Sequence, residues 1–393
     1  MPNLPQAEWT RRPELAHLVA SLGPGNARWV GGAVRDTLLG CEAHDIDAAT
    51  PLTPKEVIDR LDEAGIRTIP TGIAHGTVTA ILPGGNVEIT TLRHDVSTDG
   101  RRATVAFASD WKDDAARRDF TINALYADPL TLEIFDYFGG VDDLVAKRVR
   151  FIGDARQRIR EDHLRILRYF RFQARFGAAL DPEAEAACAE LAPTLKGLSR
   201  ERVGWELQNL LAIADPSPTV ARMRELGVMQ VILPEAGRHE VDKLAALVAA
   251  EKAHGIEGDP IRRLAALLPS VPPVAEAVAA RLRLSRSQRD RLTCVAARDM
   301  RDGERPQALA YMAGLPCAID RLLMTGSDPG PLTDWEPPML PLKGGEIVAR
   351  GVAAGPEVAR ILQAIERQWI EEGFPDRPRV EAILAEHLSA RPV

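Results

Sequence analysis

The sequence predicts an α+β domain in the first third of the chain, followed by an all-helical remainder. Between residues 27 and 150, short runs rich in β-branched residues, at 28–30, 76–82 and 87–92, alternate with glycine-rich turns. After residue 150 such runs nearly vanish, and Ala, Leu, Arg and Glu recur at helical spacing. A chain of 393 residues is also too long for one ordinary core, so several domains are expected.

The clearest helix of the first third begins with a capping box. Thr53 stands at the N-cap, Pro54 at the first helical position and Glu56 three residues after the cap. This helix is expected to end near Gly65. The following Pro-Gly-Gly-Asn at 83–86 lies between two alternating runs and predicts a hairpin turn.

The helical remainder is divided by prolines. The segment 327–341 contains five prolines and is expected to be a linker before a last helical segment at 344–387. No fixed-period repeat and no low-complexity tract occurs in the sequence.

The composition, with 45% hydrophobic and 27% charged residues, is typical of a soluble globular protein. No stretch approaches the roughly 18 apolar residues of a membrane span, and no signal peptide is recognisable at the N-terminus. Four cysteines, Cys41, Cys188, Cys294 and Cys317, lie far apart without a CxxC pair. This spacing argues against both a zinc site and a disulfide framework, so a cytoplasmic location is expected.

A net charge of -7 does not favour binding to RNA, but the charge is unevenly distributed along the chain. Residues 147–176 hold ten Arg or Lys against three acids. A basic patch is therefore expected in this segment.

The first chemical motif is Val-Gly-Gly-Ala-Val-Arg-Asp at 30–36. A strand that ends in Gly31 and Gly32 and turns into a helix brings backbone N–H groups close to a phosphate, and Arg35 adds a bidentate donor. The motif predicts a triphosphate-binding turn. No GxxxxGK[ST] sequence occurs, which disfavours a P-loop NTPase.

Two acids, Asp45 and Asp47, follow this turn in an Asp-Ile-Asp sequence. In an extended segment residues i and i+2 point the same way, so both carboxylates face the same side. Such a pair repels itself unless cations are bound, and two Mg²⁺ ions would offset the repulsion and hold the reacting groups for an in-line phosphoryl transfer. Glu88, on the polar face of the run at 87–92, is a candidate third carboxylate; a solvent-facing glutamate is the alternative.

A second motif is Arg-Arg-Asp-Phe-Thr-Ile-Asn at 117–123. Arg118 could pair with the triphosphate, while Asp119 or Asn123 could accept or donate a hydrogen bond at a ribose hydroxyl. Taken alone, this cluster is equally consistent with an ordinary charged surface.

The third motif, at 161–176, predicts an amphipathic helix with an arginine face. The arginines of this face are Arg165, Arg168, Arg171 and Arg175. Asp162 lies one turn before Arg165 and can share its face.

An aspartate beside an arginine can select nucleobases. Cytosine and adenine both present an exocyclic amine beside a ring-nitrogen acceptor, whereas uracil and guanine present the opposite pair. Asp162 and Arg165 would therefore admit C and A and reject U and G without a template. A plain surface ion pair between the two residues is the alternative.

The strings GGAVRDTLLG, HDIDAAT, VEITTLR, RRDFTINAL, FGGVDDL, EDHLRILRYFRFQARF and LSRERVGWEL occur in this order. They resemble the ordered motifs of the tRNA nucleotidyltransferase and poly(A) polymerase family over residues 27–210. The resemblance implies a polymerase-β-like head at 1–145, then a helical neck at 146–210, a body at 211–330 and a tail at 331–393.

The resemblance also implies an activity: addition of C, C and A to the 3′ end of tRNA from CTP and ATP, with Mg²⁺ as cofactor and release of pyrophosphate. Asp45 and Asp47 would bind the metal. The nucleotide site would comprise Gly31, Gly32, Arg35, Arg118, Asp119, Asp162, Arg165, Arg168 and Arg171. No obligate protein partner is evident.

Two departures from the family pattern are Asp136-Tyr137-Phe138 before Gly139, and Ala103 after Arg102 in a loop thought to govern the change from C to A addition. Alternatives within the family are a poly(A) polymerase and an enzyme that adds only CC or only A. The first usually has a long basic C-terminal tail, whereas this chain ends in LSARPV.

Two alternatives come from other classes. An HD-type metal phosphohydrolase is suggested by His-Asp pairs at 44–45 and 94–95, but both pairs fall in the first third and such a fold needs its ligands across a helical domain. A noncatalytic RNA-binding module would leave Asp45 and Asp47 beside the glycine turn unexplained.

Overall fold

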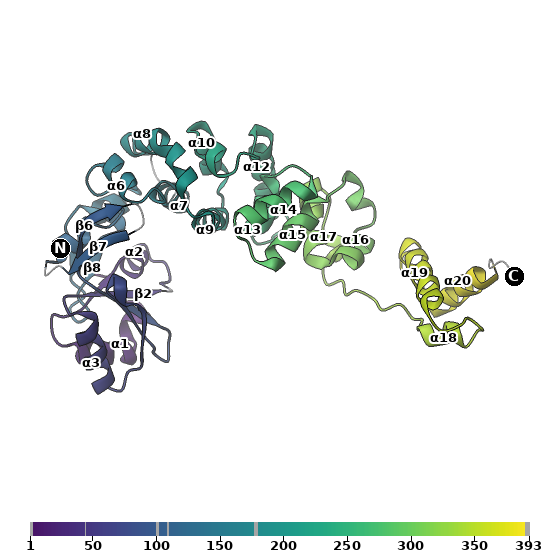
Figure 1. Ribbon diagram of the computed structural model, residues 1–393, viewed down its shortest axis with the longest axis horizontal. Helices are drawn as coiled ribbons and strands as arrows, with labels where there is room; N and C mark the ends of the chain where they lie inside the picture. The colour runs from purple at the N-terminus through teal and green to yellow at the C-terminus, as the bar shows by residue number, and fades with distance from the viewer. Residues whose placement is uncertain (1–2, 44, 100–101, 108–109, 177–179, 390–393) are drawn as a thin grey trace. The chain divides into compact units, whose positions relative to one another are not determined.

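The computed structural model describes residues 3–43, 45–99, 102–107, 110–176 and 180–389 (Figure 1). It divides into two compact units, residues 1–234 and 235–393. The first unit contains a sheet domain and a set of helices, and the second is helical throughout its described residues.

The first unit is built on a seven-stranded sheet with the order β3-β4-β5-β2-β1-β8-β9. Within it β2 and β5 run parallel and the other neighbours run antiparallel. A separate hairpin follows β5. The strands are β1 Arg28–Val30, β2 Ile46–Thr50, β3 Thr68–Gly72, β4 Thr77–Ala80, β5 Val87–Thr91, β6 Arg93–Asp99, β7 Arg102–Phe107, β8 Leu125–Ala127 and β9 Ile134–Asp136.

Short helices accompany this sheet: η1 Trp9–Arg11, α1 Pro13–Leu22, α2 Gly32–Leu38, α3 Pro54–Glu63, η2 Ile73–His75, α4 Trp111–Ala116, η3 Thr121–Asn123 and α5 Gly140–Val145. The expected capping box is present in α3, where Thr53 accepts from the Glu56 backbone N–H and Glu56 accepts from that of Thr53. The apolar face of α3 buries Val57 and Leu61.

The strands expected from sequence are confirmed within two residues at their ends. The runs at 28–30, 76–82 and 87–92 correspond to β1, β4 and β5, and the turn at 83–86 joins the antiparallel pair β4 and β5. Five strands were not expected: β3, the paired strands β6 and β7, and the strands β8 and β9.

After the sheet the first unit continues with α6 Ala155–Glu161, α7 Arg165–Phe176, α8 Pro182–Leu191, η4 Ala192–Gly197, α9 Arg200–Leu211, α10 Ser217–Glu225 and α11 Val228–Ile232. Helix α7 packs on α9 and α10. Its other side contacts the sheet domain through aromatic rings: Phe120 lies 5.5 Å from Phe172 and 6.3 Å from Tyr169, between ring centroids. This apolar contact fixes α7 against the sheet domain.

The second unit consists of α12 Arg238–Ala253, α13 Pro260–Ala266, α14 Pro272–Arg281, α15 Arg286–Ala296, η5 Met300–Glu304, α16 Pro306–Ala313, α17 Leu315–Thr325, η6 Gly330–Leu332, α18 Gly344–Val348, α19 Pro356–Glu371 and α20 Arg377–Ser389. The segment 327–341, expected as a linker, contains only the 3-10 turn η6. The expected last helical segment consists of the three helices α18, α19 and α20. Together these elements confirm an α+β first third and a helical remainder.

One expectation from the cysteines is wrong. Cys294 on α15 and Cys317 on α17 form a disulfide, whereas Cys41 and Cys188 are free. The two partners are 23 residues apart in sequence, and the packing of α15 against α17 brings them together. Spacing in the sequence could not reveal this pair, because it depends on which helices pack. No helix among the described residues is long and apolar enough to cross a membrane.

Candidate active site

The glycine turn has the geometry expected of it. Gly31 follows β1 with φ of 70° and ψ of -121°, a backbone conformation that favours glycine, and it precedes the first turn of α2. Its N–H donates to the Leu125 carbonyl at 3.1 Å, and its carbonyl accepts from the Arg35 N–H at 3.0 Å. The turn is therefore fixed at both ends, next to the start of α2.

Three acids lie beside this turn. Val30 of β1 is the register partner of Asp47 on β2, and Asp47 is the register partner of Glu88 on the parallel strand β5. Register partners on neighbouring strands project to the same face of a sheet, so Asp47 and Glu88 are neighbours. Asp45 lies in the bend directly before β2 and is exposed.

The surroundings of Asp47 favour a bound cation. Burial, together with the charges of Glu88 and Asp45, raises the pKa of Asp47 to about 6, and the charge of Arg118 opposes this shift. A carboxylate in this state gains when a divalent cation replaces the proton and cancels the repulsion. The residues therefore fit a Mg²⁺ site.

The site does not enclose a metal with protein groups alone. Over the part of the chain that the structure describes, no three His, Cys, Asp or Glu side chains come close enough to hold a metal ion. Mg²⁺ commonly binds one or two carboxylates together with substrate phosphates. This arrangement suits Asp45 and Asp47 as ligands, and it leaves Glu88 next to Asp47 without a defined place in the coordination.

Arg118 points at the glycine turn. Its Nη1 lies 3.6 Å from the position that a Cβ on Gly31 would occupy. The other nitrogens are engaged: Nε donates to the Tyr126 hydroxyl and Nη2 to Asp114, both at 3.1 Å. The guanidinium therefore presents one edge to the turn and to Asp47, as a triphosphate contact requires.

Asp119, which follows Arg118 in the chain, is buried. Its Oδ1 accepts from the Phe120 N–H at 2.8 Å and from Asn123 Nδ2 at 3.0 Å, and its Oδ2 accepts from Arg168. Burial raises the pKa of Asp119, but the charge of Arg168 and these hydrogen bonds lower it by more. Asp119 is thus ionised and occupied within the protein, rather than open to a ribose hydroxyl.

Arg35 also differs from its expected place. Its side chain is 6% exposed, pairs with Asp36 at 2.8 Å and donates to Asn123 Oδ1 at 2.5 Å. Its guanidinium also lies over the rings of Phe172 and Phe176 on α7. In this arrangement Arg35 joins α2 to α7, and the backbone of the turn is the open phosphate donor.

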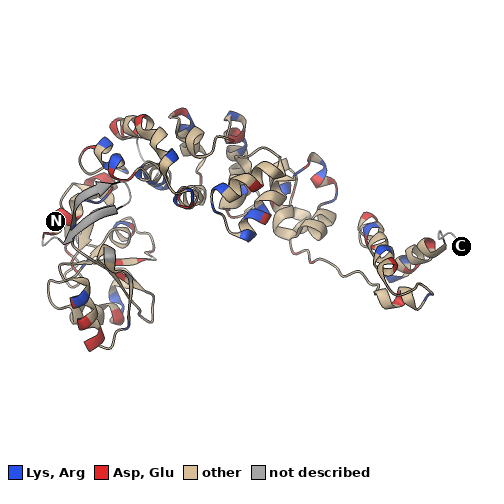
Figure 2. Cartoon of the chain, viewed as in Figure 1, with Lys and Arg blue, Asp and Glu red and all other residues tan. Residues whose placement is uncertain are grey.

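Helix α7 carries the predicted arginines, and Lys and Arg positions are blue along the ribbon in Figure 2. Each of the four arginines of the face has a carboxylate partner. Arg168 pairs with Asp119 at 2.6 Å and Arg171 with Glu206 of α9 at 2.7 Å. Glu206 is completely buried. The face therefore lies between the sheet domain and α9, and its charge is largely neutralised by carboxylates.

Asp162 and Arg165 do not pair with each other. Asp162 pairs with Arg202 of α9 at 2.7 Å and caps the start of α7 through the Leu164 N–H. Arg165 pairs with Glu161 at 2.7 Å and also donates to two backbone carbonyls, those of Arg158 and Arg117. The two residues are close in sequence, but the side chain of each is bound to a different partner.

Sequence reasoning missed four residues of this site. Asp114 and Tyr126 hold Arg118, Glu206 holds Arg171, and Asp36 links Arg35 to Arg175. A signal was present for Asp114, since it precedes Arg117 and Arg118 by three and four residues on a short helical turn. No local signal identifies Glu206, because its partner lies 35 residues away.

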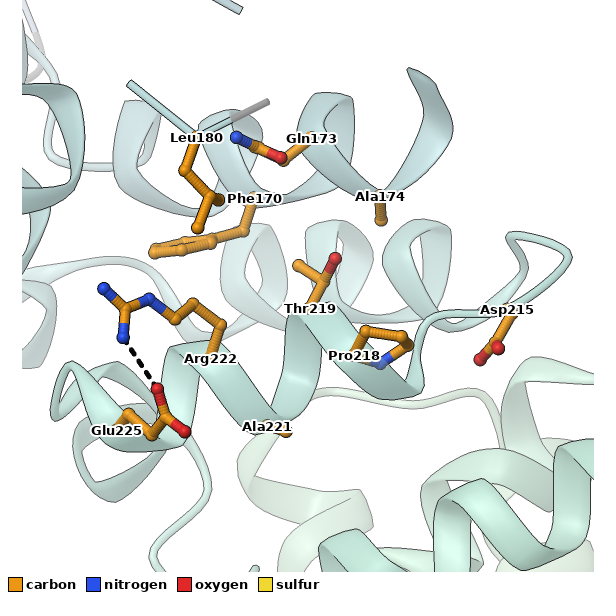
Figure 3. Close-up of a pocket in the computed structure, with 10 residues that line it drawn as sticks. All are labelled: Phe170, Gln173, Ala174, Leu180, Asp215, Pro218, Thr219, Ala221, Arg222 and Glu225. Carbon is orange, nitrogen blue, oxygen red and sulfur yellow. Dashed lines mark hydrogen bonds and ion pairs between the residues drawn. The ribbon is translucent and has the colours of Figure 1, made fainter. Parts of the chain in front are cut away.

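A separate hollow of about 450 Å³ lies between α7 and α10 (Figure 3). Its lining includes Phe170 and Ala174 from α7 and Thr219 and Arg222 from α10. Arg222 is paired with Glu225 and with Glu185. None of the expected site residues is among those that line this hollow, so it is distinct from the site expected from sequence.

The loop expected to govern the change from C to A addition has residues 100–101 outside the described residues. His44 of the first His-Asp pair lies outside them as well.

Comparison with known protein families gives two matches. Residues 27–150 match the model of the "Poly A polymerase head domain", and residues 177–238 match the "Probable RNA and SrmB- binding site of polymerase A".

Named relatives cover most of the chain. Human "CCA tRNA nucleotidyltransferase 1, mitochondrial" is 37% identical over 88% of this chain and 83% of its own length. The "CCA-adding enzyme" of Geobacillus stearothermophilus is 32% identical over 93% of this chain and 94% of its own length.

Solved structures agree in fold. The Bacillus stearothermophilus CCA-adding enzyme in complex with CTP superposes with a TM-score of 0.74 at 28% identity, covering 96% of this chain and 98% of that one. The Thermotoga maritima CCA-adding enzyme complexed with tRNA superposes with a TM-score of 0.72 at 22% identity, covering 99% of this chain and 100% of that one. The architecture is therefore the polymerase-β-like head with helical domains.

Proposed function

The chain belongs to the CCA tRNA nucleotidyltransferase family, and we propose that it adds C, C and A to the 3′ end of tRNA from CTP and ATP. The 3′-hydroxyl oxygen of the tRNA forms a bond to the α-phosphorus, the bond to the β-phosphate oxygen breaks, and pyrophosphate leaves. The relatives named above carry this activity in their names, and they cover most of this chain.

The observation that supports the chemistry is the register of β1, β2 and β5. It places Asp47 between the glycine turn and Glu88. The positive charge of Arg118 acts on Asp47 as well. We propose that Asp45 and Asp47 hold Mg²⁺, which supplies charge neutralisation at the triphosphate. Backbone N–H groups at Gly31 and Gly32 and the free edge of Arg118 then orient the phosphates.

Base recognition is assigned to the start of α7. Asp162 and Arg165 are proposed to bind the Watson–Crick edge of C or A, with Arg168 and Arg171 lining the pocket. Both members of the first pair are held by protein partners, so nucleotide binding must replace some of these contacts.

The four-part division is proposed with the same roles: catalysis in residues 1–145, base recognition in 146–210, and RNA binding in 211–330 and 331–393. The family match at 27–150 supports the catalytic division. The match at 177–238 supports RNA binding at the start of the division 211–330. The two compact units, which separate at residue 234, do not follow these boundaries.

The proposed compartment is the cytoplasm. A free, exposed Cys41 supports a reducing environment, although the Cys294–Cys317 disulfide and the mitochondrial relatives do not. Cell fractionation with antibodies to the chain decides between compartments.

The activity is tested by incubating the full chain with Mg²⁺, each labelled NTP and tRNA ending before C74, after C75 or mature. Two C residues followed by one A are expected. Long A tracts would instead indicate a poly(A) polymerase, and addition of only CC or only A would indicate a partial enzyme. An Asp45→Ala, Asp47→Ala variant is expected to bind tRNA without incorporating CTP, which separates an enzyme from an RNA-binding module.

A further inference from the structure

Arg118 is held by a closed triangle of hydrogen bonds. Its Nη2 donates to Asp114 Oδ2 at 3.1 Å, and its Nε donates to the Tyr126 hydroxyl at 3.1 Å. The Tyr126 hydroxyl in turn donates to the same Asp114 oxygen at 2.6 Å. Two of the three guanidinium nitrogens are thereby used, and Nη1 is the one directed at Gly31.

The two partners of Arg118 are more deeply buried than Arg118 itself. The side chain of Asp114 is 1% exposed, that of Arg118 is 19% exposed, and Tyr126 is completely buried. Trp111 and Tyr137 contact the Tyr126 ring edge-on at 5.9 and 6.1 Å between centroids. Asp114 also pairs with Arg117 at 2.7 Å. Asp114 and Tyr126 are therefore held in place by the residues packed around them, whereas the Arg118 side chain is partly exposed.

A free arginine side chain has several rotatable bonds, and fixing it costs conformational entropy each time a ligand binds. A guanidinium already fixed by a carboxylate and a hydroxyl avoids that cost and loses little when it donates hydrogen bonds to phosphate oxygens. Asp114 also keeps the positive charge balanced before the triphosphate arrives.

We propose that Asp114 and Tyr126 are positioning residues that aim Arg118 at the β- and γ-phosphates of the incoming nucleotide. This inference rests on the proposed function, because it assigns Arg118 to the triphosphate. Neither residue touches the nucleotide. Their contribution is therefore expected to depend on the terminal phosphates and not on the base or ribose.

The test compares equilibrium binding of CTP and CMP to the full chain, without tRNA, in Mg²⁺. Asp114→Asn and Tyr126→Phe are each expected to weaken CTP binding by about tenfold, the scale of one charge-assisted hydrogen bond, and to leave CMP binding unchanged. Tyr126→Phe keeps the packed ring and serves where Asp114→Asn unfolds the domain.

Asp143 offers a matched control. It too is a fully buried aspartate with two arginine partners, Arg148 and Arg150, and a hydroxyl partner, Thr121. Asp143→Asn is expected to change neither CTP nor CMP binding. An equal loss of both ligands in the Asp114 and Tyr126 variants, or a loss of CTP binding in Asp143→Asn of the same size, overturns the positioning role.

Arg118→Gln separates this inference from the proposed function. If Arg118→Gln leaves CTP affinity intact, the assignment of Arg118 to the triphosphate is wrong. If Arg118→Gln weakens CTP binding and Asp114→Asn and Tyr126→Phe do not, only the positioning role is wrong. Adding Asp114→Asn to Arg118→Gln is expected to cause no further loss, since the group that Asp114 aims is already absent.

Discussion

Arg168 on α7 and Asp119 in the sheet domain form an ion pair of 2.6 Å, with the aspartate 9% exposed. Both residues were expected to bind nucleotide, and the structure joins them to each other. Arg168 also approaches the buried Glu206 at 3.7 Å. The pair thus links the segment 117–123, which lies next to the glycine turn, to helix α7, which is proposed to recognise the base.

Breaking this pair from one side is expected to destabilise the first unit. Arg168→Met leaves Asp119 and Glu206 buried without their shared cation, at a cost of about 3 kcal/mol. The double variant with Asp119→Asn is expected to recover part of that loss, because one of the unpaired charges is removed. Denaturant unfolding measures both. Arg160→Met, which alters a 60% exposed arginine at 4.0 Å from Glu190, is the control and is expected to change stability little.

The stability of the metal-free protein is expected to fall as pH rises from 4 to 6. Burial, with Glu88 and Asp45, raises the pKa of Asp47 from 3.8 to about 6. The folded chain therefore keeps a proton that the unfolded chain has released, and this contribution is lost as pH passes 6. Asp47→Asn has no such proton to lose and is expected to melt at a higher temperature than the wild type at pH 8 in a chelator. A lower melting temperature for the variant would contradict the raised pKa.

Mg²⁺ is expected to reverse this effect in the wild type only. At pH 8 the ion stabilises the folded protein by binding the two carboxylates, so the melting temperature rises with Mg²⁺ concentration. Asp45→Asn and Asp47→Asn are expected to show little rise. Chelation is expected to abolish CTP incorporation by the wild type, and added Mg²⁺ is expected to restore it. Activity that survives exhaustive chelation would count against a metal mechanism.

Asp162→Ala is expected to relax base selection. Without the carboxylate that accepts from the exocyclic amine, CTP and ATP lose part of their advantage over UTP, by about a hundredfold in kcat/KM. The measurement is single-nucleotide addition with each of the four labelled NTPs. Glu161→Gln, one residue earlier and paired with Arg165, is the control, and it is expected to keep UTP excluded. An unchanged ratio of C to U addition in Asp162→Ala assigns base recognition elsewhere.

The disulfide predicts a thiol count. Under denaturing, non-reducing conditions the isolated chain is expected to label two cysteines, Cys41 and Cys188, and four after reduction. Closing a loop of this length stabilises the folded second unit by about 3 kcal/mol in the chain-entropy model. Cys317→Ser is therefore expected to lower its stability under oxidising conditions and to match the reduced wild type. Four reactive thiols before reduction would show that the bond does not form.

The sequence was most informative where structure is local. The capping box at Thr53, the glycine turn at Gly31 and the amphipathic helix at 165–176 were all predictable, because each depends on residues within one or two turns. Alternation along 87–92 also placed Glu88 on the polar face of its strand. Its adjacency to Asp47 required the order of the sheet, which places β5 beside β2 although 36 residues intervene between β2 and β5.

The partners of the arginines were not predictable. The pairs of Arg171 with Glu206, Arg175 with Asp36 and Asp162 with Arg202 join residues 35 to 139 positions apart. They depend on how α7 lies between the sheet domain and α9. Local spacing instead suggested a contact between Asp162 and Arg165, and the basic segment 147–176 appeared as an open patch because its acidic partners lie elsewhere in the chain.

The neutralised arginine face of α7 has a consequence for substrate sorting. A cleft lined by unpaired guanidinium groups would attract any polyanion, including the backbone of the tRNA. Here those charges are already satisfied by carboxylates at Asp119, Glu206 and Asp36. A nucleotide that binds at the proposed site gains only if it displaces specific ionic partners, and those carboxylates are available to pair with the arginines again when it leaves.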